Sequence, residues 1–189
     1  MIKKGKKKNN LTPFKVGGKV KPPYFVGREK ELEKLVNDAK TLSQNNVIVA
    51  PRRYGKTSLL HNVKILTEKE SDILVVDVNC REMDSIEDFY KITIAAMLGA
   101  YERRHKVKGF LSTFQRVFYD KIVETLRRVQ KIGGSLGKVG EFYLKFREKS
   151  VREKDLAKAT FDFIRNFSEE KKQNMIIIFD EFQKTHSFD

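Results

Sequence analysis

An apolar run that opens into a tight turn and continues as Gly-Lys-Thr restricts the folds open to this chain more than any other feature. Residues 46–50 read Asn-Val-Ile-Val-Ala, which predicts a strand, and Gly55, Lys56 and Thr57 precede an apolar helical start. In such a unit the backbone N–H groups of the loop and the N-terminus of the helix face one point, where phosphate binds. The sequence therefore predicts a phosphate-binding loop between a strand and a helix.

The residue types in the loop fit this chemistry. In the pattern G-x-x-x-x-G-K-[ST] the lysine reaches the β- and γ-phosphates and the hydroxyl ligates Mg²⁺, which are the roles predicted for Lys56 and Thr57. Ala50 stands where the first glycine belongs, and a small residue can serve there if its φ stays negative. A chance Gly-Lys-Thr in a surface turn is the alternative. The candidate nucleotide-binding residues of this segment are Ala50, Pro51, Arg52, Arg53, Tyr54, Gly55, Lys56, Thr57 and Ser58.

A second apolar run ends in two carboxylates. Residues 175–179 read Met-Ile-Ile-Ile-Phe and are followed by Asp180 and Glu181. A run that is apolar on both faces predicts a buried strand of a parallel sheet. Because successive side chains of a strand point to opposite faces, the two acids can have separate roles. Asp180 is suited to hold Mg²⁺ through its water shell, and Glu181 is suited to polarise an attacking water as the catalytic residue.

The other predicted elements complete a layered order. Helical spacing of apolar residues predicts a helix over 29–42, and residues 73–79 predict another buried strand. Strand, helix and strand in this order form a βαβ unit, which indicates a parallel sheet between helices. The region 85–167 is predicted as a long helical insertion with a capping-box start at Ser85. Within it we expect a helix over 112–131, a glycine-rich mobile linker or turn over 133–140, a short strand over 142–146 and a helix over 155–167.

Several of these segments resemble one family. Residues 51–59 (Pro-Arg-Arg-Tyr-Gly-Lys-Thr-Ser-Leu) and 179–183 (Phe-Asp-Glu-Phe-Gln) resemble the Walker A and Walker B segments of the archaeal-type AAA ATPases, which are also widespread in bacteria. Residues 10–14 and 24–32 look like the entry segment of that family. The resemblance covers essentially residues 10–189.

The resemblance implies a fold and a ligand. The fold is α/β, a P-loop NTPase of the AAA type, in which a parallel sheet forms the middle of a three-layer sandwich. The ligand is ATP with Mg²⁺, and the Val-Gly-Arg-Glu stretch packs near the adenine in related ATPases. Gly27 and Arg28 are therefore further candidate nucleotide-binding residues. On this basis residues 22–189 are expected to form the N-terminal part of a P-loop ATPase domain.

The sequence departs from the family after the acidic strand, because it stops at Asp189. In such ATPases a strand with a polar sensor residue, arginines that stabilise the transition state and a helical lid come later. We therefore expect a sheet that is incomplete after the Walker B strand, and little ATP hydrolysis by this chain alone. A second copy of the chain and a separate C-terminal polypeptide are candidate partners.

Positive charge is concentrated at the N-terminus. The formal net charge is +14, and eight lysines but no acidic residue lie in residues 1–21. A lysine-rich arm poor in apolar residues is expected to be disordered. It can contact nucleic acid phosphates or serve as a solubilising tail. The alternative function is therefore a nucleic-acid-binding protein with a regulatory or vestigial nucleotide site. Further basic residues in the predicted insertion are Arg103, Arg104, His105, Lys106, Lys108, Arg127, Arg128 and Lys131.

Composition adds limits on location and metal chemistry. The single cysteine, Cys80, allows no internal disulfide and fits a reducing cytoplasm. Its place at the end of a predicted strand favours a small buried residue over a nucleophile. No run approaches the roughly 20 apolar residues of a membrane helix, so we expect no membrane partner. The sequence shows no cluster of Cys and His with metal-ligand spacing, and the expected metal is the Mg²⁺ that accompanies ATP.

Overall fold

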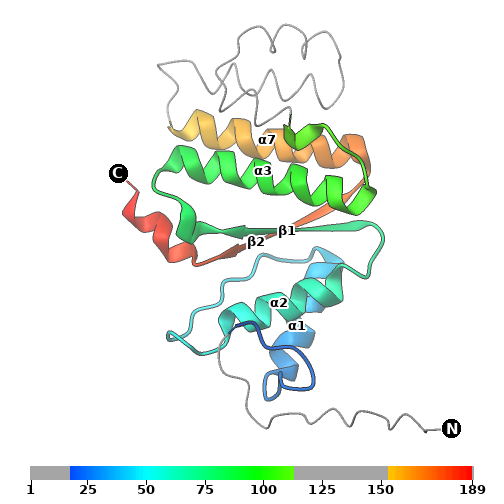
Figure 1. The fold of residues 1–189 in the computed structure, drawn as a ribbon, viewed down its shortest axis with the longest axis vertical. Helices are drawn as coiled ribbons and strands as arrows, with labels where there is room; N and C mark the ends of the chain where they lie inside the picture. Colours follow the sequence, from blue (N-terminus) through cyan, green and yellow to red (C-terminus); the bar gives the residue numbers. More distant parts are fainter. Residues whose placement is uncertain (1–17, 113–152, 189) are drawn as a thin grey trace, which may run out of the picture. The chain divides into compact units, whose positions relative to one another are not determined.

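The computed structural model describes residues 18–112 and 153–188 (Figure 1). The chain divides into two compact units, residues 1–65 and residues 66–189, and each is described by itself. Several predictions lie outside the described residues. These are the basic arm up to residue 17, most of the helix predicted over 112–131, the glycine-rich turn over 133–140, the strand over 142–146, and the basic residues Arg127, Arg128 and Lys131.

The second unit contains a parallel pair of strands. Strand β1 (Ile73–Asn79) pairs with β2 (Asn174–Asp180) in a register that runs from Ile73 opposite Asn174 to Asn79 opposite Asp180. Both strands were predicted from their apolar runs and both are present. The first is largely buried as predicted, whereas in β2 only Ile178 is buried, so the predicted burial of the second strand is not confirmed. The carboxyl ends of parallel strands meet at one edge, so Asn79 and Asp180 lie there together. The mixed order of helices and parallel strands agrees with the α/β class at this coarse level.

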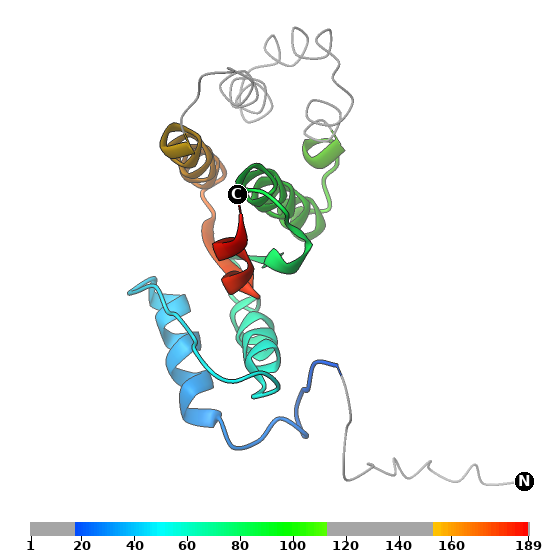
Figure 2. The same cartoon turned by 90° about the vertical axis from the view of Figure 1, so that its left-hand side faces the viewer.

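Two long helices cover one face of this pair of strands. Helices α3 (Ile86–His105) and α7 (Glu153–Lys171) lie side by side on the same side of β1 and β2 (Figures 1 and 2). The face that they cover carries alternate residues of β1, as the period of two requires. The buried core of this unit consists of Leu74, Val76, Val78, Cys80, Met83, Phe89, Tyr90, Ile94, Met97, Leu98, Ala100, Leu156, Phe163, Ile164 and Phe167.

The two helices lie at the ends of the region 85–167 that was predicted as an insertion. Residues of both helices belong to the buried core of this unit. The two ends of the predicted insertion are therefore part of the core. In the part of the chain that the structure describes, no helix is long and apolar enough to cross a membrane.

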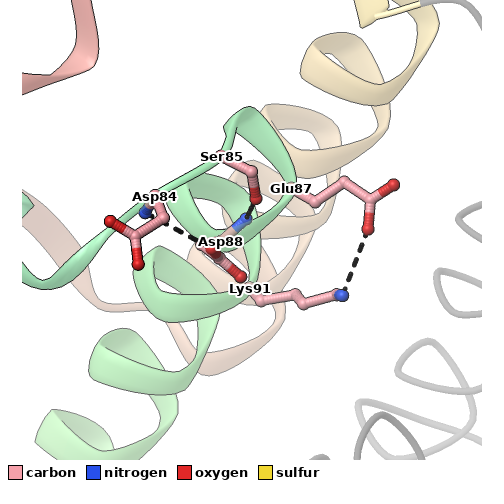
Figure 3. Close-up of polar contacts among 5 residues, drawn as sticks. All are labelled: Asp84, Ser85, Glu87, Asp88 and Lys91. Atoms are coloured by element: carbon pink, nitrogen blue, oxygen red, sulfur yellow. Dashed lines mark hydrogen bonds and ion pairs between the residues drawn. The ribbon is translucent and has the colours of Figure 1, made fainter. Parts of the chain in front are cut away.

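The start of α3 follows the predicted capping pattern (Figure 3). Ser85 Oγ accepts a hydrogen bond from Asp88 N at 3.1 Å, as an N-cap residue does. The Asp88 carboxylate reaches back to the N–H of Asp84 at 3.4 Å, one residue before the cap. Lys91 pairs with Glu87 one turn apart at 3.3 Å. The cap thus fixes where the helix begins, close to the carboxyl end of β1.

The first unit contains no strand among its described residues, and the strand predicted over 46–50 is wrong. Residues 43–50 are irregular and lie between α1 (Glu29–Thr41) and α2 (Lys56–Thr67). The side chains of Val47 and Val49 are 86% and 90% exposed. A strand needs a hydrogen-bonded neighbour, and both described strands belong to the other unit. Within residues 18–65, the apolar run over 46–50 therefore has no strand to pair with.

Cys80 is fully buried at the end of β1. Burial raises the pKa of its thiol to about 11, and the negative charge of Asp180 adds to the shift. A thiol with a raised pKa and no access to solvent is a poor nucleophile. The prediction that Cys80 is a small buried residue is confirmed.

Candidate functional site

The predicted phosphate-binding loop is a turn that leads directly into α2. Tyr54 N donates to Pro51 O at 3.3 Å, and Leu59 N donates to Gly55 O at 2.9 Å. Arg53 and Gly55 have φ values of +66° and +76°, in the left-handed region. At Gly55 this conformation favours the absence of a side chain. The sequence thus has a glycine at a loop position whose conformation favours one.

The start of the loop tolerates the alanine at the position of the usual first glycine. Ala50 is not among the residues with positive φ, so its side chain causes no backbone strain there. The condition set for a small residue at this position, that its φ stays negative, is therefore met. The left-handed conformation is instead found three residues later, at Arg53.

Lys56 places its ammonium group at the start of the loop. Lys56 Nζ donates to Ala50 O at 2.6 Å and to Pro51 O at 3.1 Å. Because Lys56 is also the first residue of α2, this cation adds to the partial positive charge of a helix N-terminus. The loop and the helix start thus gather positive charge beside N–H groups, and this arrangement attracts anions.

Arg28 connects the loop to α1. Arg28 Nη1 donates to Tyr54 O at 3.0 Å, and its guanidinium group lies over the Tyr54 ring at 5.9 Å. On its other side Arg28 Nε donates to Glu31 Oε2 at 2.6 Å, and the two side chains form an ion pair. Next to it, Glu29 accepts a hydrogen bond from Gly27 N at 2.8 Å, which lowers the pKa of the Glu29 carboxyl. Of the two predicted residues, Arg28 therefore contacts the loop, and Gly27 hydrogen-bonds Glu29.

An open groove of about 430 Å³ lies between the loop and the residues that precede α1. We call residues 18–28 the lead-in segment. The groove is within the size range of small-molecule sites. Its walls come from two parts of one unit, and the lining residues are Val20, Tyr24, Phe25, Val26, Arg28, Arg53, Tyr54, Gly55 and Ser58. Five of the predicted site residues therefore surround one groove whose other wall is apolar and aromatic.

The acidic pair lies in the other unit, at the carboxyl end of β2. The Asp180 carboxylate accepts a hydrogen bond from Glu181 N at 3.0 Å. Glu181 is exposed, has a left-handed backbone conformation and accepts a hydrogen bond from Gln183 Nε2 at 2.6 Å. The structure therefore places Asp180 at the end of a strand, as predicted, and Glu181 just beyond it. Within residues 18–112 and 153–188 no group of three or more His, Cys, Asp or Glu side chains could hold a metal ion.

Some site residues were missed by sequence reasoning. Val20 and the aromatic pair Tyr24 and Phe25 line the groove, and the apolar run Tyr24-Phe25-Val26 before Gly27 was a usable signal. Asn62, whose Nδ2 donates to the groove residue Val20 at 2.8 Å, had no such signal, because one polar residue on an amphipathic helix is common. Glu31, which pairs with Arg28, was also missed.

The basic residues near the end of α3 are partly used by the fold. Arg104 Nη1 donates to Glu68 O at 2.8 Å and Arg104 Nη2 donates to Glu70 O at 2.5 Å. His105 hydrogen-bonds Gln173 at 2.9 Å. Arg104 therefore holds the connection between α2 and β1. Of the basic residues predicted in this stretch, Arg103, Lys106 and Lys108 are exposed.

Comparison of the chain with protein-family models, with curated proteins and with solved structures finds no match.

Proposed function

We propose that this chain is the ATP-binding module of an AAA-type P-loop ATPase and that it binds Mg-ATP. The observation that carries the proposal is the position of Lys56. Its ammonium lies over the carbonyls of Ala50 and Pro51 at the start of a loop that ends in a helix N-terminus. A loop of this kind suits a chain of phosphates.

The groove beside the loop supports a nucleotide over a simple anion. Inorganic phosphate would need only the loop, whereas the groove offers an apolar and aromatic wall next to it. Aromatic rings and an arginine suit a flat base. We assign the triphosphate to the loop and the adenine to the groove.

Mg²⁺ fits the residue types that the proposal assigns to it. The Thr57 hydroxyl and the Asp180 carboxylate both offer oxygen, which this cation prefers, and each is a candidate ligand within its own unit. When bound, Mg²⁺ neutralises charge on the β- and γ-phosphates. Glu181 is exposed and carries a carboxylate that can accept a proton from water, so we assign it the role of the catalytic residue.

A cytoplasmic location belongs to the same proposal. The single cysteine is a free, buried thiol, which fits a reducing compartment.

The test is calorimetric titration of the full chain with Mg-ATP. Lys56→Ala deletes a charge-assisted contact to phosphate, worth about 1.5–3 kcal/mol, so affinity should fall roughly 10- to 150-fold. Lys34→Ala on α1 removes an equal charge from an exposed helix position and should leave the affinity unchanged. Equal ATP affinity in Lys56→Ala and the unmodified chain would contradict the site. No ATP binding together with salt-dependent DNA binding would favour the alternative function, a nucleic-acid-binding protein.

A further inference from the structure

Two side chains of α2 hold the backbone of Val20. Val20 N donates to Ser58 Oγ at 3.0 Å, and Asn62 Nδ2 donates to Val20 O at 2.8 Å. Both polar side chains are buried, with Ser58 8% and Asn62 3% exposed. We call this pair of hydrogen bonds the Val20 contact. It satisfies the N–H and the C=O of one residue in an irregular segment, as a neighbouring strand would.

The orientation of the Asn62 side-chain amide is fixed by two hydrogen bonds. Its Nδ2 also donates to Ser58 O at 2.7 Å, so two carbonyl oxygens converge on the same atom. An oxygen at this position would face two acceptors without a hydrogen between them, which only the NH₂ group avoids. Removing or inverting the amide therefore leaves Val20 O without its partner from α2.

The Val20 contact attaches the start of the lead-in segment to α2. The hydrogen bond from Arg28 Nη1 to Tyr54 O at 3.0 Å attaches its end to the loop. Between them, the N–H groups of Tyr24 and Phe25 both donate to Lys21 O, at 2.9 and 3.1 Å, and form a turn. Tyr24 and Phe25 line the groove from this turn. The apolar wall of the groove is thus formed by a short segment that is held by hydrogen bonds near both of its ends.

We propose that Asn62 is a positioning residue which, through Val20, sets the affinity of the groove for the base and sugar of a nucleoside triphosphate. This inference rests on the proposed function. The hydrogen bonds described within the phosphate-binding loop join Lys56 to Ala50 and Pro51, and Tyr54 to Pro51, and none of them includes Val20. Loss of the Val20 contact therefore loosens the wall for the base while the triphosphate keeps its loop.

The two halves of the ligand can be separated with inorganic tripolyphosphate, which has phosphates but no base. In Asn62→Ala, affinity for Mg-ATP should fall about tenfold, as expected for one buried hydrogen bond left unmade. Affinity for Mg-tripolyphosphate should stay within about twofold, because the loop is unaltered. Asn37→Ala, at an exposed position of α1, is the matched control and should change neither affinity. A purely structural role for Asn62 would lower both affinities equally.

Val20→Pro is the second variant, because it deletes the N–H donor from outside every helix and strand and leaves α2 intact. It should reduce affinity for ATP and spare tripolyphosphate. Equal loss for both ligands, or loss for neither, in the two variants would overturn the role of Asn62 and leave the proposed function standing. Failure of the unmodified chain to bind either ligand would overturn both.

Discussion

The described part of residues 66–189 is organised around apolar side chains, whereas the described part of residues 1–65 is organised around hydrogen bonds of polar side chains. Among residues 66–189, α3, α7 and the two strands enclose a continuous apolar core. Among the described residues of 1–65, only Leu59 and Val63 are buried apolar residues. The candidate groove belongs to the region with few apolar contacts.

The contrast shows how the residues around the candidate groove are held in place without an apolar core. Asp38, at the end of α1, accepts hydrogen bonds from Ser43 Oγ, Gln44 Nε2 and Asn46 Nδ2, which lowers the pKa of its carboxyl. These bonds fix the residues that lead to the loop. Each such hydrogen bond contributes only about 0.5–1.5 kcal/mol net to stability. The described part of residues 1–65 is therefore expected to be less stable than the apolar core of residues 66–189. Segments that bind ligands are commonly drawn from such regions.

The largest effect that we expect is in the core. Phe167 is 1% exposed and its ring packs against Tyr101 and Phe110 with centroids 5.1 and 5.9 Å apart. Phe167→Ala should lower the free energy of unfolding by about 3–5 kcal/mol, because it leaves a cavity. Phe161→Ala on the same helix is the control, since Phe161 is 47% exposed. Comparable losses for the two variants in denaturant titrations would mean that α7 does not bury the face described here.

A helix cap in the same region should have an intermediate effect. Ser85→Ala removes the acceptor of Asp88 N and should lower the free energy of unfolding by about 1 kcal/mol. Ser71→Ala changes an exposed serine outside the helices and serves as the reference. Denaturant midpoints that agree between the two variants would show that the cap contributes nothing measurable to α3.

The smallest effect should be at the exposed valines of residues 1–65. Val49→Ser should change the free energy of unfolding by less than about 0.5 kcal/mol, because the side chain is 90% exposed. Val76→Ser, at a fully buried position of β1, should forfeit the burial of a valine, about 1.5–3 kcal/mol. A large loss for Val49→Ser would mean that residues 46–50 are buried after all, and the contrast between the two regions would fail.

Sequence patterns succeeded where burial organises the chain. Both strands of the pair, the start of α3 at Ser85 and the helix that leads to β2 follow from apolar spacing and a cap residue. The same reasoning failed at residues 46–50, because an apolar run indicates a buried strand only if a neighbour is present to pair with it. The motif located the loop residues beside the groove, but not the apolar wall opposite them.

The sequence by itself determined the local units: which runs form helices and strands, that a glycine stands at residue 55 where φ is positive, and that Lys56 follows it. Tertiary structure decided which distant residues meet. Asn62 and Val20 are 42 positions apart, and Arg28 and Tyr54 are 26 apart. Local sequence patterns reveal helices and strands through their periodic apolar residues. A single hydrogen bond between an irregular segment and a helix produces no such periodic pattern. Its partners are defined only when the chain is folded.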